Sequence, residues 1–119
     1  MATPLQVFLV SLDGLFRQAL ARECLAIAGS ARCLESDDGM GAMLAPALEC
    51  MDLVLLDVEL VRRHGNAWLT NWRRMVPQGA VLVVDAQNDH TLPAVREAMH
   101  DAVRTAYAGP RCGTGARLK

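Results

Sequence analysis

The sequence predicts a single α/β domain built on a parallel, doubly wound sheet. Two features of the 119-residue chain support this fold class. Short apolar runs without alternation occur at residues 7–12, 53–56 and 81–84, and strands buried on both faces of a parallel sheet have this pattern. Segments with apolar residues at helical spacing separate these runs. Strands that alternate with helices favour a parallel sheet with right-handed crossovers.

The amino-terminal part is predicted to contain two strands and one well-formed helix. Residues 7–12 form the first strand, and Asp13 is placed to cap the helix at residues 15–28. Gly29 is expected to end that helix. Residues 31–36 then form a short second strand.

A weaker helix is expected next, with its apolar face within residues 40–48. Asp37 and Asp38 are predicted to cap it. Pro46 should kink or shorten it, because proline lacks the N–H group that a helix interior requires.

The central strand is predicted at residues 53–56 and ends in the carboxylate of Asp57. Open α/β sheets place their chemistry at the carboxyl ends of such strands, so Asp57 is the first candidate site residue. A solvated turn, rather than an anion site, is expected to follow at Arg62, Arg63, His64 and Gly65.

The carboxyl-terminal part is predicted to add a helix at residues 66–76, a turn at 77–79 and a strand at 81–84 that ends in Asp85. A further helix spans about residues 92–104, and residues 106–108 could form a last, short strand. The remaining chain is too short and too rich in glycine for a packed helix. We therefore expect one domain at residues 1–110 and a short flexible tail at residues 111–119.

Composition limits the possible functions. Apolar residues make up 52% of the chain and charged residues 21%, which indicates a globular protein. A net charge of -1 gives no electrostatic reason to expect binding to nucleic acid or to a membrane surface. No apolar run approaches the thickness of a bilayer and no signal-type segment is visible, so we expect a cytoplasmic protein.

The four cysteines lack the spacing of metal ligands. Most of them fall in segments that should be buried or half-buried, where a thiol packs as a small apolar side chain. Structural thiols are therefore expected rather than a zinc site or a disulfide framework, at Cys24, Cys33, Cys50 and Cys112.

In order and spacing, these segments resemble the receiver domains of bacterial response regulators, especially those whose output is a helix-turn-helix module. The resemblance covers residues 7–110. It rests on V-F-L-V-S-L-D-G-L-F-R-Q-A-L, S-D-D-G-M-G-A-M-L, D-L-V-L-L-D-V-E-L, G-N-A-W-L-T-N-W-R-R, V-L-V-V-D-A and V-R-E-A-M-H-D-A-V-R-T-A-Y-A-G-P. It implies a flavodoxin-like sheet of strand order 2-1-3-4-5, here with a weak last strand and no final helix, and it makes Asp57 the counterpart of the phospho-acceptor.

Several receiver residues are replaced in this sequence. The acidic pair that holds magnesium in the family corresponds to Ser11 and Leu12, with Asp13 one step further on. The family's hydroxyl residue corresponds to Asp85, its switch aromatic to Ala106 and its lysine to Gly109. Phosphoryl transfer needs a metal to neutralise developing charge, so magnesium binding and phosphorylation of Asp57 should be weakened or absent.

Asp57 and Asp85 raise a further possibility. Two neighbouring carboxylates raise each other's proton affinity or bind a cation between them, and a shared proton or an adventitious cation is expected before catalysis. No metal or other cofactor is expected unless Asp57 is a working phospho-acceptor.

The leading interpretation is a receiver-like signalling domain without enzymatic activity that acts through protein–protein contacts at about residues 90–108. A missing final helix would leave an apolar sheet face that a partner protein or a second copy should cover. A phospho-accepting receiver is the first alternative. A small-ligand-binding domain is the second, although no glycine-rich phosphate loop follows the first strand.

Overall fold

The structure is a computed structural model that describes residues 5–29, 31–37, 51–76 and 80–108. In chain order the elements are β1 (Gln6–Val10), α1 (Gly14–Ala28), β2 (Arg32–Ser36), β3 (Leu53–Asp57), α2 (Val58–His64), α3 (Asn66–Met75), β4 (Ala80–Val84) and α4 (Thr91–Ala108). The helix expected at residues 40–48, the turn at 77–79 and the tail at 111–119 lie outside the described residues.

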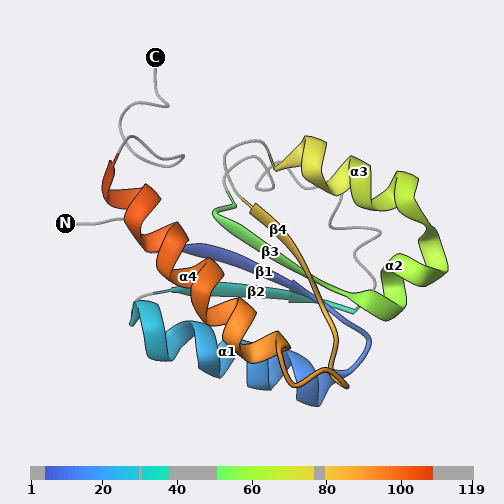
Figure 1. The fold of residues 1–119 in the computed structure, drawn as a ribbon, viewed down its shortest axis with the longest axis horizontal. Coiled ribbons are helices and arrows are strands. Elements are labelled where there is room, and N and C mark those ends of the chain that lie inside the picture. The colour runs from blue at the N-terminus through green and yellow to red at the C-terminus, as the bar shows by residue number, and fades with distance from the viewer. Residues whose placement is uncertain (1–4, 30, 38–50, 77–79, 109–119) are drawn as a thin grey trace.

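The four strands form one parallel sheet in the order β2-β1-β3-β4 (Figure 1). In the register, Val10 of β1 lies beside Leu56 of β3, and Asp57 of β3 lies beside Val84 of β4. Strands β1 and β3 lie at the centre, with β2 added outside β1 and β4 added outside β3. This is the arrangement of a doubly wound, flavodoxin-like sheet. The predicted fold class is therefore confirmed, with the order 2-1-3-4 for the strands described.

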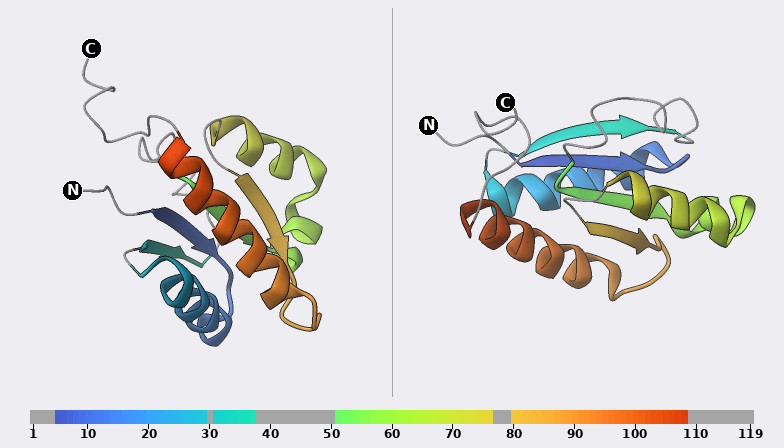
Figure 2. Two further views of the ribbon diagram at one scale, coloured as in Figure 1. Left: turned by 60° about the vertical axis from the view of Figure 1, so that its left-hand side comes forward. Right: turned by 90° about the horizontal axis from the view of Figure 1, so that it is seen from above.

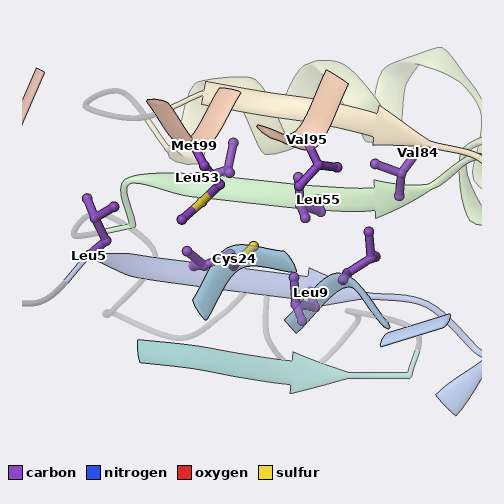
Figure 3. Close-up of a cluster of buried hydrophobic side chains, with 10 residues drawn as sticks. Leu5, Leu9, Cys24, Leu53, Leu55, Val84, Val95 and Met99 are labelled. Carbon is purple, nitrogen blue, oxygen red and sulfur yellow. The ribbon is translucent and has the colours of Figure 1, made fainter. Parts of the chain in front are cut away.

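The side chains of each inner strand alternate between two apolar clusters, one on each face of the sheet. The first cluster joins the sheet to α1 and α4, and its best buried members include Leu9, Leu20, Leu55, Val95 and Met99 (Figure 3). The second joins the other face to α2 and α3, and it includes Phe8, Val54, Leu60, Trp68 and Trp72. Both faces of β1 and β3 are thus covered, which explains their unbroken apolar sequences.

Helix α4 lies beside α1 on the same face of the sheet (Figures 1 and 2). Val95 and Met99 are fully buried there, and Arg96 forms an ion pair with Glu23 of α1, with an N–O distance of 2.8 Å. Within the described residues, α4 covers this face beside α1, and the expectation that a partner chain or a second copy covers it stays a prediction. Its premise was the missing last helix, but α4 takes up the position beside α1.

Arg62, Arg63 and His64 form the last turn of helix α2, so the expected solvated turn at these residues is also wrong. Basic residues at this end are favourable because the helix carboxyl terminus has a partial negative charge. Gly65 then links α2 to α3 with φ of 90°, a conformation that L side chains rarely adopt.

The last short strand expected at residues 106–108 is absent, because these residues continue helix α4 to Ala108. Their alanine-rich sequence favours helix over strand. Within the described ranges, no helix combines the length and apolar character needed to cross a bilayer.

Candidate functional site

Asp57 lies at the carboxyl end of β3, where the sequence places it, and it is 7% exposed. Its backbone also begins helix α2, for which Asp57 is the N-cap residue. The carboxylate is therefore held between the end of a buried strand and the start of a helix. This is the edge of the sheet at which open α/β folds bind ligands.

One carboxylate oxygen of Asp57, Oδ2, accepts a hydrogen bond from Ser11. The Ser11 Oγ–Asp57 Oδ2 distance is 2.6 Å, and Ser11 is completely buried. Ser11 directly follows β1, whose Val10 lies beside Leu56, so the two polar residues end neighbouring strands at the same level. Side chains alternate between the two faces along each strand, and by this alternation Ser11 and Asp57 lie on the same face of the sheet.

The direction of this bond follows from the other contact of the hydroxyl group. Ser11 Oγ accepts the backbone N–H of Asp13 at 3.0 Å, so its own proton is directed to the carboxylate. The 2.6 Å distance to Asp57 is at the short end of the range for O–H···O hydrogen bonds.

The other carboxylate oxygen of Asp57, Oδ1, caps α2. Its Oδ1 atom accepts the backbone N–H of Glu59 at 3.0 Å, which satisfies one of the unpaired donors at the start of the helix. Both carboxylate oxygens of Asp57 are therefore engaged by the protein itself.

The backbone of Ser11 is also fully used. Its N–H donates to Ser36 O at 3.1 Å, and its carbonyl accepts a hydrogen bond from Arg17 Nη1. Arg17 is held in turn by Glu35 of β2, with an Nε–Oε1 distance of 3.0 Å. These contacts fix Ser11 between β1, β2 and α1, so its hydroxyl is positioned in advance against Asp57.

Asp13 serves as the N-cap of α1, as the sequence predicts. Its Oδ1 atom accepts the backbone N–H groups of Leu15 and Phe16 at 3.0 and 3.1 Å. The carboxylate is thus used at the start of its own helix.

Asp85 uses its side chain in a local turn. Its Oδ1 atom accepts Gln87 N–H at 2.9 Å, and its carbonyl accepts the Thr91 hydroxyl at 2.7 Å. In the register, Val84 rather than Asp85 lies beside Asp57. Within the described part of the chain, no hydrogen bond joins the two carboxylates that the sequence suggested as a pair.

The structure places two of the three other residues that the resemblance matches to receiver positions. Leu12 is 51% exposed, the backbone of Ala106 lies in the last turns of α4, and Gly109 lies outside the described residues.

A magnesium ion would find few suitable ligands here. It prefers oxygen ligands in octahedral geometry, with one or two carboxylates and several waters. Asp57 is the one carboxylate at the centre of the site, and both of its oxygens are already hydrogen-bonded. In the described part of the chain, no group of three or more His, Cys, Asp or Glu side chains could hold a metal. The donor set therefore does not fit this ion.

A pocket of about 330 Å³ lies beside the candidate site, between the end of β4 and the start of α4. Both apolar and polar residues line it. The lining residues are Val58, Val83, Val84, Asp85, Asn88, His90, Thr91 and Ala94.

Comparison with known proteins finds similarity to solved structures only. A scan against protein-family models and a search of curated proteins found no match. The chain is similar to the signal receiver domain of the response regulator NarL from Mycobacterium tuberculosis, with 20% sequence identity, a TM-score of 0.48, and coverage of 85% of this chain and 97% of that chain. The fold is flavodoxin-like. At this level of identity the similarity says nothing about individual side chains.

Ser11 is the functional residue that sequence reasoning missed. We regarded it as a lost metal ligand, whereas the structure makes it the hydrogen-bond donor to Asp57. A signal was available in the sequence, because two neighbouring apolar strands each end in a single polar residue, V-F-L-V-S and L-V-L-L-D.

Proposed function

We propose that this chain is a receiver-like signalling domain that acts through protein–protein contacts and whose Asp57 is not phosphorylated. The 2.6 Å hydrogen bond from buried Ser11 to Asp57 is the main support. It uses one acceptor site of Asp57 Oδ2, and its donor, Ser11, stands where the family resemblance would place an acidic metal ligand. A domain without that chemistry signals by the shape of its surface and is not an enzyme.

The outer side of α4 is the surface that we propose for partner contact. Its inner side is buried against the sheet through Val95 and Met99. Charged and polar residues of mixed sign face outward on the same helix, among them Glu97, His100, Asp101 and Arg104. A partner that binds there must offer complementary polar groups, since the apolar stripe of α4 is already used.

The phosphorylation part of the proposal is tested by intact mass. The protein is incubated with magnesium and acetyl phosphate, and Asp57→Asn is the matched control because asparagine keeps the shape and can still cap α2. We expect no phosphoryl adduct on either protein. A magnesium-dependent adduct on the wild type that is lost in Asp57→Asn would favour the phospho-accepting alternative.

The contact part begins with light scattering at rising protein concentration, because a second copy is the simplest candidate partner. A concentration-dependent dimer that Glu97→Lys disrupts would identify this side of α4 as the self-contact. A monomer at every concentration would leave a different protein as the partner.

A small-ligand-binding domain remains a second candidate, because the pocket of about 330 Å³ at the end of β4 is of the size that small ligands use. The test is an NMR titration with ATP or ADP in the absence of magnesium. Shifts confined to Val58, Asn88 and Thr91 would favour this function over contact signalling.

A further inference from the structure

The pocket between the end of β4 and the start of α4 combines aliphatic side chains with a carboxylate that the protein uses only in part. Its aliphatic lining residues are Val58, Val83, Val84 and Ala94. Asp85 lines the same pocket and is half-buried. Its Oδ1 atom accepts Gln87 N–H at 2.9 Å, whereas no hydrogen bond or ion pair with another described residue engages Oδ2. One charged acceptor is thus left for a ligand.

Other polar groups around the pocket are bonded within the protein. The Thr91 hydroxyl donates to Asp85 O at 2.7 Å and accepts Asp85 N–H at 3.1 Å. Asn88 Oδ1 accepts His90 N–H at 2.8 Å. These contacts fix the turn between β4 and α4, so the Asp85 carboxylate is held in place beside the aliphatic lining.

The start of α4 is poorly suited to an anion, although helix N-termini often bind anions through free backbone N–H groups. The Thr91 N–H donates to Asn88 O at 3.1 Å. The Ala94 N–H donates to His90 O at 3.1 Å, and Pro93 has no N–H group. Among the described residues that line the pocket there is no lysine or arginine. The lining therefore favours a positively charged ligand over a phosphate.

We propose that this pocket binds a small aliphatic ammonium ion. The ammonium group donates to Asp85 Oδ2, and its carbon chain packs against the valines and Ala94. An ammonium group has donors only, and its hydrogen bond to a carboxylate is charge-assisted. This inference names the ligand class of the small-ligand function considered above and rests on that function, not on contact signalling.

The size of the pocket agrees with a small ligand. Its volume of about 330 Å³ is near the lower end of the range of about 300–1,000 Å³ that ligand pockets span. A short branched chain is therefore expected to fit better than a nucleotide.

The test is an NMR titration of the full chain with isobutylamine, which is protonated at pH 7 as the lysine side chain is. Isobutanol and isobutyrate are the matched probes, because they carry a branched chain of the same kind with a hydroxyl or a carboxylate group. We expect saturable shifts at Val58, Val84, Asn88 and Thr91 with isobutylamine, in the millimolar range that suits so small a ligand. Neither matched probe should saturate.

Asp85→Asn removes the charge, while its amide oxygen can still accept Gln87 N–H. The affinity for isobutylamine should fall about tenfold or more. Asp89→Asn is the control, because Asp89 is exposed and does not line the pocket, and salt screens such a charge. If Asp85→Asn does not fold, Ala94→Leu fills the pocket from an exposed position and should abolish saturation.

Three results would overturn the proposal. Equal affinity of wild type and Asp85→Asn would remove the role of the carboxylate. Saturable shifts with ATP, ADP or isobutyrate in place of isobutylamine would retain the small-ligand function but exclude a cationic ligand. The absence of saturable shifts with every probe would exclude both the ligand class and the small-ligand function.

Discussion

At the scale of single residues, the hydroxyl group of Ser11 determines how the Asp57 carboxylate is hydrogen-bonded. Ser11 is small enough to be buried at the end of β1, and its donor is directed at Asp57 because its acceptor is already bonded to Asp13 N–H. A carboxylate at position 11 would instead face Asp57 with like charge, unless a cation lay between them. With serine at position 11, both carboxylate oxygens of Asp57 have hydrogen-bond donors from the protein itself.

Ser11→Ala should destabilise the protein by about 1–3 kcal/mol, because it leaves a buried carboxylate oxygen and the Asp13 N–H without partners. Urea unfolding measures the change, and the fluorescence of buried Trp68 and Trp72 reports it. Thr70→Ala removes a hydroxyl at an exposed position of α3 and is the matched control. Equal stability of the two variants would show that the Ser11–Asp57 hydrogen bond contributes nothing.

The sequence was sufficient to select Asp57 and to predict the cap at Asp13, because both depend on local patterns. It did not show that Ser11 donates to Asp57, because that contact joins residues 46 positions apart. Nor could it show that Asp85 is used in its own turn, since the register offset between β3 and β4 is set by the packed sheet.

At the scale of elements, the least predictable feature was the side of the sheet that α4 takes. Its apolar stripe of Val95, Met99 and neighbours was visible in the sequence. Such a stripe indicates that one face of the helix is buried, but it does not indicate on which side of the sheet the helix packs. Helix α2 was missed for a related reason. Its seven residues are too short for a periodic signal, and its start depends on the Asp57 cap.

Met99→Ala tests the position of α4. Met99 is fully buried between α4, α1 and the sheet, so its truncation should cost about 2–5 kcal/mol. His100→Ala, the next residue on the same helix and exposed, should change the free energy of unfolding by less than about 0.5 kcal/mol. Similar values for the two variants in denaturant unfolding would mean that α4 does not cover this face.

At the scale of the whole molecule, the fold supplies a scaffold on which internal hydrogen bonds hold the polar residues around Asp57. The doubly wound sheet and its two apolar clusters are specified by short, unbroken apolar runs, which is why the fold class could be predicted. The strand order was implied by the resemblance to receiver domains and not by these runs. Signalling by contact requires only that this scaffold present a fixed surface. We therefore expect that the edge around Asp57 does not respond to the ligands of a phospho-receiver.

The most direct measurement is an amide NMR spectrum of the full chain before and after addition of magnesium with beryllium fluoride, a mimic of the phosphoryl group. We expect no shifts at Asp57, Val58, Glu59 or Ser11, and the same spectrum for Asp57→Asn under both conditions. Saturable shifts at these residues that require both magnesium and beryllium fluoride, and that vanish in Asp57→Asn, would contradict this expectation.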